Sequence, residues 1–439
     1  MKIIREGDGT LKKILPPAGL SAEAVYIPSQ YALPFAHRGR NYIFHTLTRQ
    51  CVEGKLPAHA KAGEGSDDLI RARFLVPEGS DECGLYSKIS ALLRAYSQKE
   101  GVRGYTILPT FACNARCVYC YEAGTVPVSM TPETADRVVR FILDTRGEGP
   151  VKISWFGGEP LLGVSVIDRI CRGLREAGVE YRSSMTSNGS LITPQVVEKM
   201  RGEWKLSRIQ ISMDGAEADY ISRKRYCGGQ DPYRAVMEAV SRMSGAGIRV
   251  TVRCNVDPEN WERIPAFLKD LGTFVENKEK VSLYFAPLNH VRRSETSLPL
   301  WEKIRDARRL IDEAGFRSMP FPTGGLGRRT NFCMADGGGL VITPDGGLYP
   351  CEQCPGGSRF GDIRQGVCDE EARREFCRTD RIREECRTCP FLPDCTGFSS
   401  CPVKDAHCRK VREMMITDEL RRLADRKETE NTEREGAFC

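Results

Sequence analysis

The chain has 439 residues, more than one ordinary hydrophobic core holds, so we expect two or three domains. Lys and Arg number 65 against 59 Asp and Glu, which gives a formal charge of +6 at pH 7. Because this small excess is spread through mixed-sign stretches, the sequence predicts no nucleic-acid partner.

Nineteen cysteines are the most unusual feature of the composition. The first residues, "MKIIREGDGT", have no apolar core of a secretory signal, and no run reaches the roughly 18 apolar residues of a membrane span. We therefore expect a cytoplasmic protein without membrane association, whose thiols stay reduced. The cysteines gather in residues 113–120 and 333–408, which favours metal ligands over disulfides.

Residues 1–100 are expected to form a small N-terminal domain. The segment 41–54, "NYIFHTLTRQCVEG", mixes aromatic and polar residues as a strand or hairpin does. The segment 85–101, "LYSKISALLRAYSQKEG", has apolar residues at helical spacing and ends in glycine. No fold is assigned to this domain.

From residue 105 onward, strand-like and helix-like segments alternate regularly. Thr131 and Pro132 give one helix an N-cap followed by an N1 proline. Alternating strands and helices favour a parallel α/β sheet, either doubly wound or closed into a full or partial barrel. The expected strands lie in residues 105–111, 151–158, 181–189, 207–215, 248–256 and 280–288.

The ends of these strands carry the unusual residues, including "CNARCVYC", "GGEP", "TSNG", "SMDG" and "RCN". In a barrel the chemistry lies at the C-terminal ends of the strands, so one shared site is expected there. After about residue 320 the alternation stops. Residues 324–408 are rich in Cys, Gly and Pro and are expected to be held by metal, and a charged helix and tail follow at 411–439.

Three cysteines without a fourth follow the first of these strands. Cys113, Cys117 and Cys120 would leave one iron of a four-iron cluster open to a small molecule. Their spacing resembles the signature of the radical SAM superfamily. The resemblance implies a [4Fe-4S] cluster that chelates S-adenosyl-L-methionine, a 5′-deoxyadenosyl radical, and an external electron donor such as flavodoxin or ferredoxin. A zinc site completed by a distant Cys or His is the alternative.

The other strand-end motifs occur in the order that the superfamily has, over roughly residues 105 to 315. The resemblance implies a partial (β/α)6 TIM-like barrel at 101–320. It also implies cofactor-binding roles for Tyr119, Gly157, Gly158, Glu159, Pro160, Asn188, Ser212, Asp214, Arg225, Arg253 and Asn255. By the same resemblance, Arg225 and Ser212 would lie near the carboxylate of S-adenosylmethionine, and Glu159 would supply an acceptor near its amino group. Tyr119 would lie against its adenine.

The second group of cysteines resembles the SPASM domain, here residues 321–410, an extension found on radical SAM enzymes that modify peptides. The resemblance implies two auxiliary iron–sulfur clusters. Cys333, Cys351 and Cys401 would bind the first, and Cys386, Cys389, Cys395 and Cys408 the second. The spacing before Cys401 departs from the family pattern. Cys354 closes the first cluster, or that cluster has an open site. Two zinc knuckles are the alternative.

Radical SAM enzymes with auxiliary clusters suit oxidative crosslinking of peptides. The leading hypothesis is a maturase that forms a thioether or another crosslink in a ribosomally synthesised precursor peptide, recognised in part by residues 1–100. The second hypothesis is an anaerobic sulfatase-maturing enzyme. Those relatives place an aspartate after the cysteine that corresponds to Cys351, where this chain has Glu352, a candidate general base. The third is a non-catalytic metal-binding scaffold, against which the "GGEP" and "SMDG" loops argue.

Overall fold

The structure is a computed structural model. It describes residues 1–99, 101–102, 104–229, 231–320, 326, 339–353, 359–375, 382–394 and 406–436. Among these residues, no helix combines the length and the apolar character that crossing a membrane requires.

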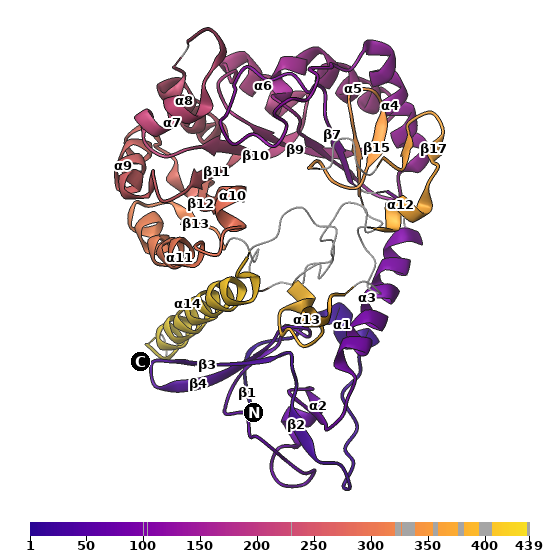
Figure 1. Cartoon of the computed structure of the whole chain (residues 1–439), viewed down its shortest axis with the longest axis vertical. Coiled ribbons are helices and arrows are strands. Elements are labelled where there is room, and N and C mark those ends of the chain that lie inside the picture. Colours follow the sequence, from indigo (N-terminus) through magenta and orange to yellow (C-terminus); the bar gives the residue numbers. More distant parts are fainter. Residues whose placement is uncertain are drawn as a thin grey trace.

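Six parallel strands form the centre of the molecule. Each strand pairs with the next one along the chain, so the sheet has the order of a barrel that does not close. Figure 1 shows this sheet as a curved wall with helices along its outer side. The prediction of a partial (β/α)6 barrel is confirmed. The strands are β7 (Gly104–Ile107), β8 (Val151–Trp155), β9 (Tyr181–Ser187), β10 (Leu206–Met213), β11 (Arg249–Val256) and β12 (Val281–Pro287).

Additional strands, which the sequence did not predict, pair with the six-stranded sheet at both of its edges. At one edge β13 (Arg317–Ser318) pairs with β12. At the other, β14 (Gly339–Ile342) pairs in parallel with β7, and the antiparallel strands β15 (Gly347–Tyr349), β16 (Gly361–Asp362) and β17 (Gly366–Val367) follow it. The start of the cysteine-rich region therefore continues the barrel sheet beside the strand that leads into the three-cysteine loop.

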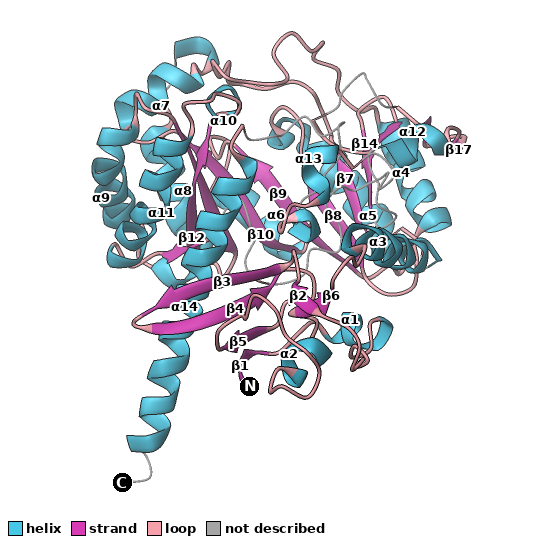
Figure 2. Cartoon of the chain, turned by 60° about the horizontal axis from the view of Figure 1, so that its bottom comes forward, coloured by secondary structure: helices cyan, strands magenta, loops and turns pink. Residues whose placement is uncertain are grey.

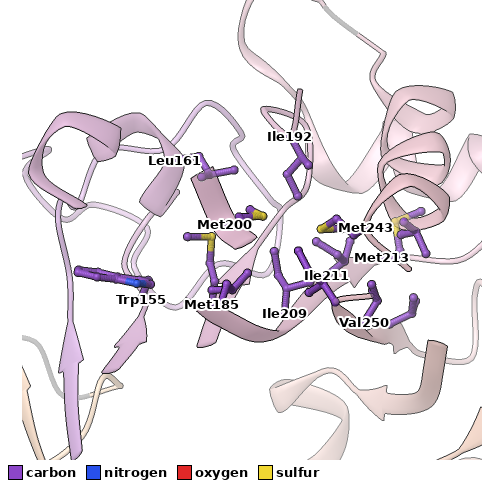
Figure 3. Close-up of a cluster of buried hydrophobic side chains, with 14 of the residues drawn as sticks. Trp155, Leu161, Met185, Ile192, Met200, Ile209, Ile211, Met213, Met243 and Val250 are labelled. Carbon is purple, nitrogen blue, oxygen red and sulfur yellow. The ribbon is translucent and has the colours of Figure 1, made fainter. Parts of the chain in front are cut away.

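Helices bury the outer face of the sheet. Met185, Ile209 and Ile211 pack against Met200 and Met243 of the helices, as Figure 3 shows. The first of these helices begins as predicted, since Thr131 Oγ1 accepts the Thr134 N–H at 3.2 Å. The helices of this region are α4 (Pro132–Thr145), α5 (Val164–Glu176), α6 (Pro194–Gly202), α7 (Glu217–Lys224), α8 (Tyr233–Gly245), α9 (Ile264–Phe274), the short α10 (Asn289–Arg292) and α11 (Leu298–Glu313).

The opposite, inner face of the sheet is polar. Because successive side chains on a strand alternate between faces, the residues between the buried positions of β10 and β11 share this face, among them Gln210, Ser212 and Arg253, all half-buried. The Tyr284 hydroxyl of β12 donates to Gln210 Oε1 at 2.9 Å across β11. This face can therefore hold a hydrated or polar ligand, unlike the packed interior of a closed barrel.

The N-terminal residues form a sheet of order β1-β5-β4-β3 and a separate strand pair, β2 with β6. The segment 41–54 contains two antiparallel strands, as its composition predicted, and the helix expected near 85–101 begins slightly earlier. We call residues 1–99 the N-terminal unit. Its elements are β1 (Lys2–Arg5), α1 (Gly9–Ile14), β2 (Tyr26–Pro28), β3 (Ala32–His37), β4 (Arg40–His45), β5 (Cys51–Glu53), α2 (Asp67–Arg71), β6 (Leu75–Pro77) and α3 (Glu82–Lys99).

The C-terminal helix α14 (Cys408–Gly436) joins the N-terminal unit to the barrel, and Figure 2 shows it below β3 and β4. Ile416 and Leu420 are buried with Phe35 and Phe44 of the N-terminal sheet. On its barrel side, α14 presents Asp418 and Glu419 to Arg308 of α11, whose side chain is 5% exposed. Before α14 lie α12 (Glu370–Glu375) and α13 (Glu384–Arg387).

We predict that Arg308→Met weakens the attachment of α14 to the barrel. Arg308 donates to Asp418 and, at 2.8 Å, to Glu419, so its loss removes two charge-assisted hydrogen bonds, each contributing about 1.5–3 kcal/mol. Hydrogen exchange of α14 and the urea midpoint would measure the loss. The neighbouring pair of Arg309 and Glu313 is exposed, so Arg309→Met should change stability by less than about 0.5 kcal/mol. Equal effects of the two variants would contradict this account.

Candidate functional site

The loop that carries Cys113, Cys117 and Cys120 follows β7 and lies between two other segments. On one side, the Gly158 N–H donates to Thr110 O at 3.1 Å and the Glu159 N–H donates to Ala112 O at 2.9 Å. The start of the loop is therefore paired with the "GGEP" turn that ends β8.

The close approach of these two backbones explains the two glycines of the turn. Gly157 has a φ of 120°, and a Cβ on it would lie 2.4 Å from Thr110 O. A Cβ on Gly158 would lie 2.4 Å from Ala112 O. Both distances are far below a van der Waals contact, so only glycine fits at either position.

The last residues of α7 and the segment that follows them hold the other side of the loop. The Arg116 N–H donates to Lys224 O at 3.0 Å, and the Val118 N–H donates to Arg223 O at 3.0 Å. The Cys227 N–H in turn donates to Asn114 O at 2.9 Å. The cysteine loop is thus bordered by β8 and by the end of α7, segments about 65 residues apart along the chain.

Glu159 is fully buried and binds the protein itself. Its Oε1 accepts from Ser187 Oγ at 2.8 Å and from the Leu161 N–H at 3.2 Å, while its Oε2 accepts from the Asn188 N–H at 2.8 Å. Burial raises its pKa, and these hydrogen bonds oppose that shift. The carboxylate therefore joins the ends of β8 and β9, and Pro160 begins a short 3₁₀ turn behind it. This is a structural use that the sequence did not predict for Glu159.

Asn188 connects that carboxylate to the cysteine loop. Its Nδ2 donates to Asn114 Oδ1 at 2.8 Å, and its Oδ1 accepts from Ser190 Oγ at 2.7 Å. Cys113 Sγ lies 4.0 Å from the same Nδ2. The "TSNG" turn thus contacts the first of the three cysteines.

Asp214 lies at the centre of a second network, immediately after β10. It is fully buried, and its Oδ1 accepts from the Tyr119 hydroxyl at 2.5 Å and from Asn255 Nδ2 at 3.2 Å. Asn255 also donates to the Tyr119 hydroxyl at 3.0 Å and accepts from Arg253 Nε at 3.0 Å. Burial raises the pKa of Tyr119 well above its usual value, so Tyr119 acts as a neutral donor that fixes the loop.

Lys224 is a residue of this site that the sequence reasoning missed. Its side chain is 3% exposed, and its Nζ lies 3.5 Å from Asp214 Oδ2. Burial lowers the pKa of Lys224, but Asp214, Tyr119, Cys117 and Tyr220 together outweigh it and hold the pKa well above its ordinary value. The buried lysine is therefore charged, close to Cys117 and Tyr119.

Arg225, which the sequence singled out instead, points away from the site. It is the left-handed C-cap of α7, with a φ of 48°, and its exposed side chain donates from Nε to Ser222 O at 3.2 Å. The helix end turns the chain so that Lys224 faces inward and Arg225 outward. Ser212 lies half-buried on the inner face of β10, beside Arg253 of β11.

Burial acts on the thiols of the cysteine loop. It raises the pKa of Cys113 to about 11 and also raises those of Cys117 and Cys120, so the neutral thiol is favoured. Metal ligation requires the thiolate, which a bound iron would stabilise. Within the described part of the chain, no three Cys, His, Asp or Glu side chains come together closely enough for a single metal ion. A four-iron cluster places its cysteines on different irons, so its ligands need not converge in that way.

Cys351 and Glu352 lie near this loop. Cys351 Sγ donates to Glu352 Oε2 at 3.8 Å, and both groups act electrostatically on Tyr121, the residue after Cys120. Cys351 follows β15, which pairs with β14 beside β7, the strand that leads into the three-cysteine loop.

The remaining predicted ligands are divided between described and undescribed residues. Cys386 lies in α13, Cys389 follows that helix, and Cys408 begins α14. All three thiols are half-buried, and Arg383 Nη2 donates to Cys386 Sγ at 3.5 Å. Cys333, Cys354, Cys395 and Cys401 lie outside the described residues.

We predict that Gly158→Ala destabilises the protein by about 1–3 kcal/mol, because the added methyl group must displace the backbone that leads into Cys113. Urea unfolding would measure this change. Gly202→Ala is the matched control, since a Cβ there meets nothing within 4 Å. Unchanged stability of Gly158→Ala would show that the turn and the loop separate easily.

Comparisons with known proteins agree with this geometry. Residues 107–271 match the Radical SAM superfamily. The AdoMet-dependent heme synthase of Methanosarcina barkeri is 23% identical over 317 residues, which cover 66% of this chain and 88% of that protein. The GTP 3′,8-cyclase of Limosilactobacillus fermentum is 34% identical over 124 residues, 28% of this chain and 36% of the relative.

Two solved structures share the fold at low sequence identity. The structure of anSMEcpe with bound AdoMet and Cp18Cys peptide has a TM-score of 0.57 at 17% identity and covers 73% of this chain and 98% of its own. Streptococcus suis SuiB bound to the precursor peptide SuiA has a TM-score of 0.52 at 14% identity. The match covers 88% of this chain and 100% of the SuiB chain. Residues 107–271 of the chain thus form a radical SAM domain and belong to the Radical SAM superfamily.

Proposed function

We propose that the protein is a peptide maturase that forms a thioether or another crosslink in a ribosomally synthesised precursor peptide. The observation that carries the proposal is the parallel pairing of β14 with β7, which joins the start of the cysteine-rich region to the strand that leads into the three-cysteine loop. Cys351 follows β15, the antiparallel partner of β14, so one sheet links the two cysteine-rich segments. The polar inner face of the barrel suits the backbone of an extended peptide.

Two cofactors follow from this proposal. Cys113, Cys117 and Cys120 would hold a [4Fe-4S] cluster, and the loops around it would hold S-adenosylmethionine. When bound, these groups supply a 5′-deoxyadenosyl radical that abstracts hydrogen from an unactivated carbon. The chain itself positions the loop through the Tyr119–Asp214 hydrogen bond and the pairing with Gly158 and Glu159.

The second cysteine group would hold auxiliary iron–sulfur clusters. We assign Cys333, Cys351 and Cys401 to one cluster, with Cys354 as a possible fourth ligand, and Cys386, Cys389, Cys395 and Cys408 to the other. The division into an N-terminal domain at 1–100, a core at 101–320, a SPASM domain at 321–410 and a tail at 411–439 belongs to the same proposal. So does an external electron donor such as flavodoxin or ferredoxin.

Lys224 would neutralise the carboxylate of S-adenosylmethionine. It is a buried cation next to Asp214, whereas the exposed side chain of Arg225 binds its own helix end. A cation held in low dielectric attracts an anion more strongly than one at the surface does. Asp214 compensates the lysine when no cofactor is present.

Anaerobic sulfatase maturation is the second candidate function. The neighbour anSMEcpe, a sulfatase maturase, shares the fold, and Glu352 lies beside the Cys351 thiol, where it could act as a general base. Both candidate functions require a peptide substrate and the same radical chemistry. They differ in whether the peptide gains a crosslink or an aldehyde.

The distinguishing experiment is anaerobic co-expression with the short peptide encoded beside the gene, followed by peptide mass measurement before and after thiol alkylation. We expect loss of two hydrogens together with loss of an alkylatable thiol, which indicates a thioether. Two hydrogens lost with every thiol still alkylated indicates a carbon or oxygen crosslink. An unchanged peptide, with a sulfatase-derived peptide converted to its aldehyde, would establish the second candidate instead.

We also predict that Lys224→Met weakens S-adenosylmethionine binding to the reconstituted protein. Losing one charge-assisted hydrogen bond, about 1.5–3 kcal/mol, corresponds to roughly 10- to 150-fold in Kd. Lys224→Arg should keep most of the affinity, which separates loss of charge from loss of folding. Arg225→Met should change Kd by less than about threefold, as for an exposed charge. A large effect at Arg225 and none at Lys224 would reverse the assignment.

A further inference from the structure

The segment 382–394, which carries Cys386 and Cys389, packs on the N-terminal unit. Ile382 and Leu392 are buried with Tyr31 and Leu47, and Cys386 lies against this cluster. Phe391 is buried in a second cluster together with residues of β3 and β4, against which Cys389 packs. Two thiols expected to bind metal therefore border the N-terminal core.

Polar side chains of the N-terminal unit bind the same segment along its backbone. Gln30 Nε2 donates to Arg387 O at 3.2 Å, and Thr46 Oγ1 donates to Pro390 O. These bonds join residues more than 340 positions apart in sequence. They hold the chain on both sides of Cys389 at fixed points of the N-terminal unit.

The strongest of these contacts is the buried pair of Arg49 and Asp394. Each side chain is 1% exposed, and Arg49 binds both carboxylate oxygens, with Nη1 2.9 Å from Oδ2. Arg412 of α14 donates to the backbone oxygen of Asp394 at 2.7 Å. Asp394 immediately precedes Cys395, so this pair fixes the chain at the entry to a third expected ligand.

This pair is better suited to fixing geometry than to adding stability. Desolvating two charges offsets most of their attraction, and apolar replacements of such pairs are often neutral. Arg49 also has a positive φ of 66°, and its buried Nε makes no hydrogen bond to any described residue. A planar, bidentate pair does, however, fix direction as well as distance.

We propose that Arg49 is a positioning residue for the auxiliary metal site to which Cys386, Cys389 and Cys408 contribute, and that the N-terminal unit is the scaffold of that site. The inference rests on the proposed function for the existence of the cluster. It adds a role to the N-terminal unit beyond peptide recognition. Through Arg49, that unit sets where the metal-binding segment lies relative to α14.

The test uses the full-length chain with Cys113, Cys117 and Cys120 replaced by alanine, so that bound iron reports the auxiliary sites. After reconstitution with ferrous iron and sulfide, iron per chain and the electron paramagnetic resonance signal are measured. Arg49→Met should lower the iron retained by at least about a third and speed alkylation of Cys386 and Cys389. Arg49→Lys keeps the charge but loses the bidentate geometry. Its iron content and its rate of alkylation should lie between those of Arg49→Met and the parent.

Two further variants separate positioning from folding. Arg49→Met combined with Asp394→Met leaves no unpaired buried charge, so its melting temperature should stay close to that of the parent while its iron content falls. Arg38→Met is the control, because Arg38 is 61% exposed and pairs with Asp425 at the surface; it should retain full iron. Full iron and slow alkylation in the double variant would overturn the inference.

The readout also distinguishes this inference from the proposed function. Iron lost from the double variant, together with a wild-type chain that leaves the peptide unmodified, would support the scaffold and contradict only the peptide chemistry. A parent chain that binds no iron without the three loop cysteines would overturn both the auxiliary cluster and the role of Arg49.

Discussion

The buried carboxylate of Asp214 is the constraint on which the geometry of the site depends. A desolvated charge costs several kcal/mol unless partners compensate it, and here the partners come from separate elements. Tyr119 comes from the cysteine loop, Asn255 from β11 and Lys224 from the end of α7. Satisfying this one carboxylate therefore requires all of these segments to be in place together.

The strand order and the location of the site could be predicted from the sequence, because both follow from local patterns. Apolar runs of strand length end in Gly, Asn and Asp, and parallel strands bring such ends to one edge. The sequence could not show which basic residues are buried. Arg223, Lys224 and Arg225 are adjacent; the first two are buried against Asp257 and Asp214, whereas Arg225, at the left-handed end of α7, is exposed. The role of Glu159 was hidden for a similar reason, since its partners lie in another strand end.

Contacts between the ends of the chain were also beyond sequence reasoning. Arg49 and Asp394 are 345 residues apart and belong to segments with no shared periodicity. Many Arg and Asp residues of the sequence could form an ion pair of this kind. Only their burial in the structure distinguishes this pair from the others. The sequence placed 1–100 and the cysteine-rich region in separate domains, yet their apolar side chains share two clusters.

Charged pairs recur wherever large parts of the molecule meet. Arg308 joins the barrel to α14, Arg49 joins the N-terminal unit to the cysteine-bearing segment, and Lys224 joins α7 to the end of β10. Apolar surfaces tolerate small sliding movements, whereas a hydrogen-bonded ion pair in low dielectric has one geometry. Under the proposed function the protein holds more than one iron–sulfur cluster, and fixed separations between clusters favour the second kind of contact. The buried pairs therefore make most sense as devices that set the relative position of the parts, with the apolar clusters supplying the stability.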